Sequence, residues 1–254
     1  MQVIAFVNQK GGVGKTTSCL NVGAGLSRKG KRVLLIDTDP QGNLTISTGI
    51  HLKDGEPTVH EVLKGSTNIN DAIKPGAYDV LPADIMLSGA EIELASVPGR
   101  EMILKEAIGE LKKPYDYILI DCPPSLSLVT INALVAANAV IVPLQCEFLA
   151  LEGITDLIRN INLIKKNFNP ALELQGVVLT MYDRRNNLSQ MVEDDVRSFF
   201  GKKVYNTVIP RNVRISEAPS HGKPVLLYDF KCPGSQAYIS LTGEVLKREK
   251  EIAA

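Results

Sequence analysis

Short apolar runs alternate along the chain with longer segments in which apolar residues recur every three or four positions. The short runs are rich in β-branched residues and nearly continuous, which is typical of strands buried on both faces. They are predicted to be strands at 3–7 (VIAFV), 32–37 (RVLLID), 115–121 (YDYILID), 139–144 (AVIVPL), 174–182 (LQGVVLTMY) and 204–210 (VYNTVIP).

The longer segments predict helices between these strands. They lie at 16–30, where Gly30 closes the helix, near 87–111, and at 127–137, 150–167, 187–200 and 234–250, while 49–60 resembles a short loop. Strands that alternate with helices indicate an α/β fold with a mostly parallel twisted sheet covered by helices on both faces. Without a repeat or a linker rich in Pro, Gly or Ser, the pattern predicts a single domain over residues 1–254.

Composition narrows the picture. Of 254 residues, 44% are hydrophobic and 22% charged, as in globular proteins, and the formal net charge is zero, so binding to nucleic acid or membrane would need a local patch. The four cysteines are far apart, which argues against a zinc site or a disulfide framework and suits a reducing cytosol. The longest apolar stretch, 133–144, is broken by Asn138 and is too short to span a bilayer. With no basic apolar leader at its start, the chain is expected to be cytoplasmic.

Chemistry enters at VNQKGGVGKTT, residues 7–17, between a predicted strand and a predicted helix. The pattern G-x-x-x-x-G-K-[ST] would need glycine at Gln9, so this is a variant phosphate-binding loop. Gly11, Gly12 and Gly14 allow the backbone to approach phosphates, whose charge is favoured at a helix N-terminus. The sequence therefore predicts a P-loop NTPase.

Neighbouring residues supply the remaining groups. Lys15 can reach the β- and γ-phosphates, and the Thr16 hydroxyl is positioned for Mg²⁺. Asp121 ends a strand where a carboxylate commonly holds Mg²⁺ through water. In LLIDTDPQGN, Asp39 is expected to orient the attacking water, and Asp37 to be structural or part of the metal shell. The segment TMYD stands where many GTPases have N-K-x-D, which favours ATP over GTP.

Several motifs together carry a resemblance. KGGVGKTT, DTDPQGN and DCPPS resemble those of deviant-Walker-A ATPases, which include ParA-type partition proteins, Min-system ATPases and nitrogenase iron proteins. PLQCEFLALEG (143–153), LTMYDRR (179–185) and IPRNVRISEAPSHGKP (209–224) are similar to chromosomal ParA (Soj) proteins. The resemblance extends from residue 2 to about 240.

The resemblance assigns the second lysine of the loop. It implies that Lys10 crosses a homodimer interface to the phosphates of the partner, as an arginine finger does in trans. By the same resemblance, Glu147 contacts the nucleotide across the dimer, and Met181, Pro210 and Asn212 pack the adenine. The full set of nucleotide-binding residues expected is Gly11, Gly12, Val13, Gly14, Lys15, Thr16, Thr17, Glu147, Met181, Pro210 and Asn212.

DNA is the second expected ligand. Arg184, Arg185, Arg211 and Arg214 lie in the C-terminal third, with Lys202, Lys203 and Lys223 as further candidates. Scattered charges alone would more often be a solvated surface. The resemblance implies that Arg185 and Arg214 bind DNA non-specifically, that a dimer doubles the patch, and that a ParB-type centromere-binding protein stimulates hydrolysis. The implied protein is a nucleoid-associated ATPase that segregates chromosome or plasmid DNA.

Other functions remain as alternatives. The same ATPase core could position another cargo. A membrane-cycling Min-type ATPase would need a basic amphipathic C-terminal helix, whereas SLTGEVLKREKEIAA has balanced charges and neither Phe nor Trp. An iron–sulfur reductase would need cluster cysteines, and Cys122 and Cys146 do not stand in a recognised ligand spacing. A metabolic kinase would need an arginine-rich lid.

Overall fold

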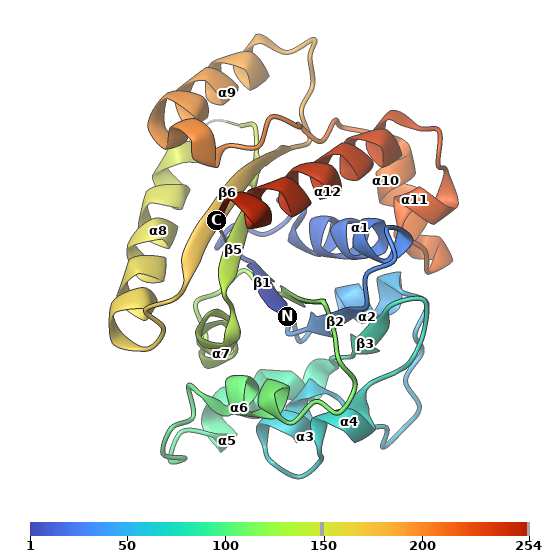
Figure 1. The fold of residues 1–254 in the computed structure, drawn as a ribbon, viewed down its shortest axis with the longest axis vertical. Helices are drawn as coiled ribbons and strands as arrows, with labels where there is room; N and C mark the ends of the chain where they lie inside the picture. Colours follow the sequence, from blue (N-terminus) through green and yellow to red (C-terminus); the bar gives the residue numbers. More distant parts are fainter. Residues whose placement is uncertain (148–149, 253–254) are drawn as a thin grey trace.

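One parallel sheet runs through the computed structural model, which describes residues 1–147 and 150–252 (Figure 1). Within these residues its strand order is β3-β2-β4-β1-β5-β6, and every pairing is parallel. The strands are β1 (Gln2–Phe6), β2 (Val33–Asp37), β3 (Asp79–Leu81), β4 (Tyr117–Asp121), β5 (Ala139–Gln145) and β6 (Glu173–Thr180). The predicted parallel α/β sheet is confirmed.

Helices connect the strands. The long ones are α1 (Lys15–Arg28), α7 (Leu128–Ala136), α8 (Ala150–Asn167), α9 (Asn187–Phe200) and α12 (Pro233–Ile252), each close to a predicted helix. The short ones are α2 (Asn43–Ser47), α3 (Val59–Leu63), α4 (Ile69–Ala72), α5 (Ala90–Glu93), α6 (Ile103–Gly109), α10 (Val213–Glu217) and α11 (Val225–Tyr228). Three 3₁₀ turns, η1 (Ile85–Gly89), η2 (Gly201–Lys203) and η3 (Ala218–His221), complete the described part.

The sheet separates two hydrophobic cores. On one face, α1, α11 and α12 pack against side chains such as Ile4, Phe6 and Leu35, and α1 lies beside α12 (Figure 1). On the other face, helices α3 to α9 cover side chains such as Leu34 and Ile36. Because both faces are covered, all five residues of β2 and of β4 are buried, which explains their continuous apolar sequences.

The strand register brings the candidate chemistry to one edge of the sheet. Asp37 and Asp121 are directly opposite each other at the carboxyl ends of β2 and β4, and Phe6 of β1 is opposite Asp121 on the other side. The phosphate loop follows β1, so it begins beside both aspartates. Ligands of open α/β sheets bind at this edge.

Two predicted elements are wrong. Segment 204–210 is not a continuous strand: it forms isolated bridges from Val204 to Val177 and from Pro210 to Tyr182, and Tyr205 N and Ile209 N donate to the Val177 and Leu179 carbonyls of β6. Between these bridges the backbone N–H groups of Asn206 and Thr207 donate to the Glu244 carboxylate instead of to β6. Proline cannot donate to a ladder at all, which shortens any pairing further.

The single helix predicted near 87–111 is divided into η1, α5 and α6. The division between α5 and α6 contains Pro98 and Gly99, and Gly99 has φ +71°, a left-handed conformation outside any helix. Strand β3 and the short helices α2 to α4 have no counterpart in the predicted elements, because each has only three to five residues and carries little periodicity.

Candidate active site

The loop between β1 and α1 needs glycine at two positions. Gly12 and Gly14 have φ +75° and +87°, and Gly14 is the N-cap of α1. This left-handed backbone is unfavourable for residues with a Cβ atom. Two side chains outside the glycines anchor the loop: Asn8 Oδ1 accepts from Lys10 N at 3.0 Å, and Thr180 Oγ1 donates to the Val13 carbonyl at 2.8 Å.

The two lysines of the loop occupy different environments. Lys15 is buried, and its Nζ donates to the Lys10 carbonyl at 3.1 Å, inside the curve of the loop. Burial lowers the pKa of Lys15, and the negative charge of Asp121 partly opposes this effect. The Lys10 side chain is 57% exposed and points out of the loop to form an ion pair with Glu147.

Asp121 is a buried carboxylate with few partners. Neither of its oxygens accepts a well-formed hydrogen bond from the described residues, although Thr16 lies close enough to favour the ionised form. Burial raises the pKa of Asp121, and the nearby charge of Asp37 adds to this. A buried carboxylate without partners beside a hydroxyl fits a Mg²⁺ site, because hard cations take oxygen ligands and a cation would compensate the charge.

The two aspartates of DTDPQGN, Asp37 and Asp39, differ in burial and in the number of hydrogen bonds that their carboxylates accept. Asp37 is fully buried and accepts from the backbone N of Thr45 at 2.8 Å, from its hydroxyl at 2.7 Å, and from Asp39 N at 3.1 Å. These bonds indicate a structural role. Asp39 is partly exposed, and its carboxylate accepts one described hydrogen bond, from Gln41 N at 2.9 Å, so this carboxylate has capacity for water.

A cleft of about 450 Å³ lies over the loop. It is lined by Gly11, Gly12, Gly14, Lys15, Thr16, Thr17, Asp39, Gln41, Asn43, Ser47, Pro124 and Met181. Most residues predicted to surround the phosphates therefore meet in one place. Val13 is buried beneath the loop and its carbonyl is engaged by Thr180, while Asp121 lies below the cleft floor.

A second cleft, of about 460 Å³, continues from the first through the shared residues Gly14, Thr17 and Met181. It contains all three residues predicted to pack the adenine, and it is further lined by Thr180, Ile209, Arg211, Ile215, Ser216, Pro219 and Tyr238. Met181 has φ +51° and is the one non-glycine residue with positive φ among those described. Such a conformation is costly and is concentrated at functional sites.

Lys10 and Glu147, both expected to act across a dimer, contact each other within one chain. The motif 143–153, from which Glu147 was assigned, includes residues 148–149, which lie outside the described part. The dimer roles of both residues stay predictions. The ion pair means that each must exchange its partner before acting in trans.

The two arginines predicted to bind DNA also have partners. Arg185 is 88% exposed and holds Asp183 through two hydrogen bonds of 3.0 and 2.9 Å, which lower the pKa of Asp183 to about 2. Arg214 contacts Glu217 at 2.9 Å and Asp229 at 3.6 Å. Arg184, Arg185 and Arg211 line a common cleft of about 530 Å³ next to the second cleft, with which it shares Pro210 and Arg211, whereas Lys203 donates to the Leu174 carbonyl.

Known proteins match this chain over nearly its whole length. Residues 1–174 match the family described as AAA domain. The chain is 56% identical to the chromosome partitioning protein ParA of Caulobacter vibrioides, covering 99% of this chain and 96% of the relative. It is 52% identical to the sporulation initiation inhibitor protein Soj of Bacillus subtilis, covering 96% and 98%. This chain belongs to the ParA/Soj family of partitioning ATPases.

Solved structures of one similar protein contain the ligands expected for this ParA/Soj-family chain. Cobyrinic acid a,c-diamide synthase from Mycobacterium smegmatis is 40% identical and superposes with a TM-score of 0.87, covering 98% of this chain and 96% of the other. It was solved with ADP and magnesium, and again with an ATP analogue and magnesium. As a member of this family the chain is an ATPase, and these complexes agree with the ATP and Mg²⁺ that its sequence predicts. Among the described helices, none has the length and apolar character needed to cross a bilayer.

Some residues of the site were not predicted from the sequence. Asn8 and Thr180 anchor the loop, Thr45 holds Asp37, and Tyr238 lines the second cleft from α12. They are common polar or aromatic residues to which the sequence motifs assigned no role. The one available signal was their place beside a motif, as with Asn8 next to KGGVGKTT and Thr180 before Met181.

Proposed function

We propose that this chain is a DNA-partitioning switch. ATP with Mg²⁺ would join two copies face to face, the dimer would bind DNA non-specifically, and a ParB-type partner would stimulate hydrolysis and release it. The observation that carries the proposal is the contrast between the lysines: Lys15 is buried under the phosphate cleft, while Lys10 projects outward from the same loop. A single chain already has one lysine for its own phosphates, so the second is available to another copy.

The residues of one chain would act as follows. Backbone N–H groups of Gly11 to Thr17 would hold the phosphates at the N-terminus of α1, with Lys15 beside the β- and γ-phosphates. Thr16, and Asp121 through water, would hold the Mg²⁺, which neutralises developing phosphate charge when it is bound. Asp39 would orient the attacking water from the opposite wall.

The remaining parts of the cleft would serve the adenine and the dimer. Met181, Pro210 and Asn212 would pack the adenine; the Asn212 Oδ1 is already used to cap α10, accepting from Arg214 N at 2.9 Å. Lys10 and Glu147 would leave their mutual ion pair and contact the nucleotide bound by the partner copy. Nucleotide bound between two copies stabilises the dimer by mass action.

DNA binding would use Arg185 and Arg214. Arg211 would connect the nucleotide site with the DNA site, because it lines both the cleft proposed to hold the adenine and the cleft that Arg184 and Arg185 line. Both DNA-binding arginines would exchange a carboxylate for a phosphate, and a dimer would offer twice the number of contacts. Such a protein would work in the cytoplasm, associated with the nucleoid.

Light-scattering mass with and without ATP and Mg²⁺ tests the switch, on wild type and Lys10→Ala side by side. Wild type is expected to change from monomer to dimer with ATP, and Lys10→Ala to remain a monomer that still binds ATP. Lys53→Ala, which removes an exposed lysine from a distant loop, is the matched control and should behave as wild type. If the mass of the wild-type protein is the same with and without ATP, the proposed ATP-dependent dimer is wrong.

A further inference from the structure

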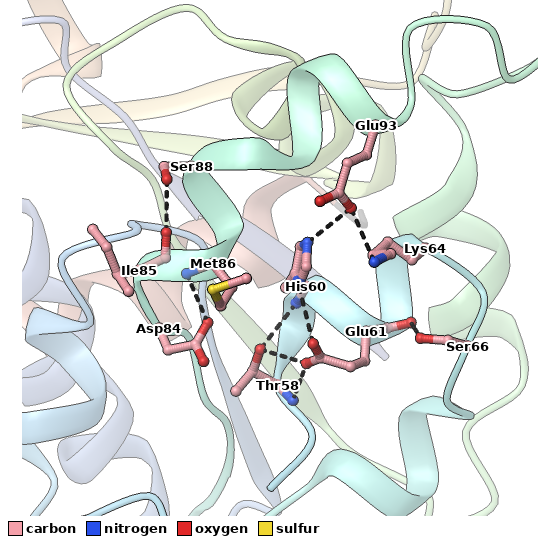
Figure 2. Close-up of polar contacts among 10 residues, drawn as sticks. All are labelled: Thr58, His60, Glu61, Lys64, Ser66, Asp84, Ile85, Met86, Ser88 and Glu93. Atoms are coloured by element: carbon pink, nitrogen blue, oxygen red, sulfur yellow. Dashed lines mark hydrogen bonds and ion pairs between the residues drawn. The ribbon is translucent and has the colours of Figure 1, made fainter. Parts of the chain in front are cut away.

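A buried histidine lies between two carboxylates on the far side of the sheet from α1 (Figure 2). His60 is 2% exposed; its Nδ1 is 3.0 Å from Glu61 Oε1, and its Nε2 is 3.1 Å from Glu93 Oε2. Glu61 also completes the capping box of α3, where its Oε2 accepts from Thr58 N at 2.9 Å. Glu93 Oε2 also forms an ion pair with Lys64 Nζ at 3.2 Å.

Both nitrogens of the His60 ring face an acceptor. Which of the two carboxylates accepts from a ring N–H depends on the tautomer of the imidazole, and the other ring nitrogen lies within hydrogen-bonding distance of the other carboxylate. Hydrogen bonds from Lys64 and His60 lower the pKa of Glu93, which keeps this carboxylate ionised. The charged groups that face the ring are thus Glu61 from α3 and Glu93 from α5, with Lys64 completing the cluster. The cluster fastens α5 to α3.

The same short helix α5 holds the start of α7. Glu91 Oε1 accepts from Leu128 N at 3.2 Å, and the N-cap residue of α7, Ser127, makes no side-chain capping bond of its own. Glu91 therefore supplies from another helix the acceptor that an N-cap residue normally provides. Its negative charge is also favourable at a helix N-terminus.

The segment that contains Glu91 is fixed at both ends. At its start, Ala83 N donates to Thr45 Oγ1 at 3.0 Å, and that hydroxyl donates to the buried Asp37. At its end, Glu93 is held by His60 and Lys64. Segment 83–93 is thus connected at its start, through Thr45, to Asp37, and through Glu91 to α7, the helix that follows Asp121.

The loop between β4 and α7 is what this segment positions. Residues 122–127 follow Asp121 directly, and Pro124 in this loop lines the phosphate cleft. One end of the loop is fixed by the sheet and the other by the N-terminus of α7. The contact between Glu91 and Leu128 therefore sets where the second end lies.

We propose that Glu91 is a positioning residue for ATP hydrolysis: anchored through Glu93 and His60, it holds the N-terminus of α7 and thereby the loop 122–127 against the phosphate cleft. The inference rests on the proposed role of Asp121 and its loop at the Mg²⁺ and phosphates. Glu91 itself does not touch the cleft, so its effect should appear in the rate of turnover more than in the affinity for ATP.

The test is ATP turnover by the full chain carrying Glu91→Ala, Glu91→Gln or the control Glu106→Ala. Glu91→Ala is expected to lower kcat roughly 3- to 10-fold, as the loss of one capping bond at the loop would, with KM for ATP changed less than about twofold. Glu91→Gln keeps an amide oxygen for Leu128 N and should restore about half of the rate or more. Glu106→Ala removes the same charge from α6, at a residue with none of these bonds, and should match wild type. Thermal midpoints should differ by no more than about 2–4 °C.

A double-mutant cycle separates positioning from general destabilisation. If α5 is fastened by Glu93, then adding Glu91→Ala to Glu93→Ala should lower kcat clearly less than Glu91→Ala does in wild type. Wild-type kcat for Glu91→Ala, or additive losses in the cycle, would overturn the proposal. Asp121→Ala is the final arm: if it abolishes turnover while Glu91→Ala does not reduce it, the positioning role alone fails, and if Asp121→Ala turns over normally, the proposed Mg²⁺ site fails with it.

Discussion

The phosphate cleft and the exposed arginines proposed to bind DNA, Arg185 and Arg214 (the arginine surface), both depend on charged side chains. The two regions hold these side chains differently. In the cleft, Lys15 is 6% exposed and Asp121 is fully buried, and backbone geometry fixes both. On the arginine surface, Arg185 is 88% exposed and is held by Asp183, while Arg214 is held by Glu217 and Asp229. Buried charges have few alternatives to their ligand, whereas exposed charges already have partners that a ligand must replace.

This difference has consequences for energy. Leaving a buried charge without a counter-charge is expensive, so a nucleotide and a cation have much to contribute at the cleft. Exposed ion pairs contribute little to stability and are weakened further by salt. Single substitutions should therefore have large effects in the cleft and small ones on the arginine surface.

The largest effect is expected from Lys15→Gln. It removes the buried lysine of the phosphate cleft while keeping a polar side chain of similar length, so kcat/KM for ATP should fall about 10³-fold or more. Steady-state turnover would measure this. The matched control is Lys29→Gln, an exposed lysine at the end of the same helix, and it should keep the wild-type rate. If both variants behave alike, the cleft does not depend on Lys15.

Asp39→Ala should come next. If Asp39 orients the attacking water, as proposed, its loss should lower turnover about 10²-fold or more while ATP binding is kept, which would trap a DNA-bound dimer. Turnover, a fluorescent ATP-binding titration and a DNA shift assay would each be measured. Asp54→Ala, an exposed loop carboxylate, is the control. Hydrolysis at the wild-type rate by Asp39→Ala would show that this residue does not orient the water.

The double substitution Arg185→Ala with Arg214→Ala should weaken DNA binding and leave ATP binding and dimerisation unchanged. Affinity for non-specific DNA should fall at least about tenfold. The slope of log affinity against log salt should decrease by roughly 3 to 4, because each arginine–phosphate pair removed from the two copies accounts for about 0.9. ATP-dependent dimerisation should persist. Arg159→Ala on α8 removes another exposed arginine and is the control. Failure of the double variant to dimerise would make these arginines structural.

The smallest effect is expected from Asp183→Asn, which frees Arg185 from its partner. DNA affinity should rise about two- to fivefold, in line with the modest strength of an exposed pair. Because hydrogen bonds from Arg185 lower the pKa of Asp183 to about 2, the gain should be the same at every pH from 6 to 8. A carboxylate with a depressed pKa stabilises the fold above its unfolded pKa of about 4 and loses this contribution as pH falls toward 2. Thermal midpoints of the two proteins should therefore converge below about pH 4. Unchanged or weaker DNA binding by Asp183→Asn would indicate that the pair does not compete with DNA.

Long periodic segments were predictable from the sequence, and irregular ones were not. Helix α12 and strand β4 follow their apolar patterns closely, because each buries the face that its sequence marks. Segment 204–210 looks equally strand-like, yet the Glu244 carboxylate from α12 accepts from the backbone N–H groups of Asn206 and Thr207, which interrupts the pairing of this segment with β6. That competitor is 34 or more residues away in the chain, and no local pattern announces it.

The candidate site divides along the same line. The sequence by itself determined the phosphate loop, the lysine pair and the strand-end aspartates, since glycine, lysine and carboxylate at fixed spacing allow few other chemistries. Only the tertiary structure decided that Asn8 and Thr180 anchor the loop, that Lys10 meets Glu147, and that Arg185 meets Asp183. It also placed His60 beside Glu93, and Glu91 at the N-terminus of the helix that follows the loop after Asp121. The physical reason is range: backbone conformation and strand ends depend on neighbours in the chain, whereas partners for buried and exposed charges are chosen by the packing of distant segments.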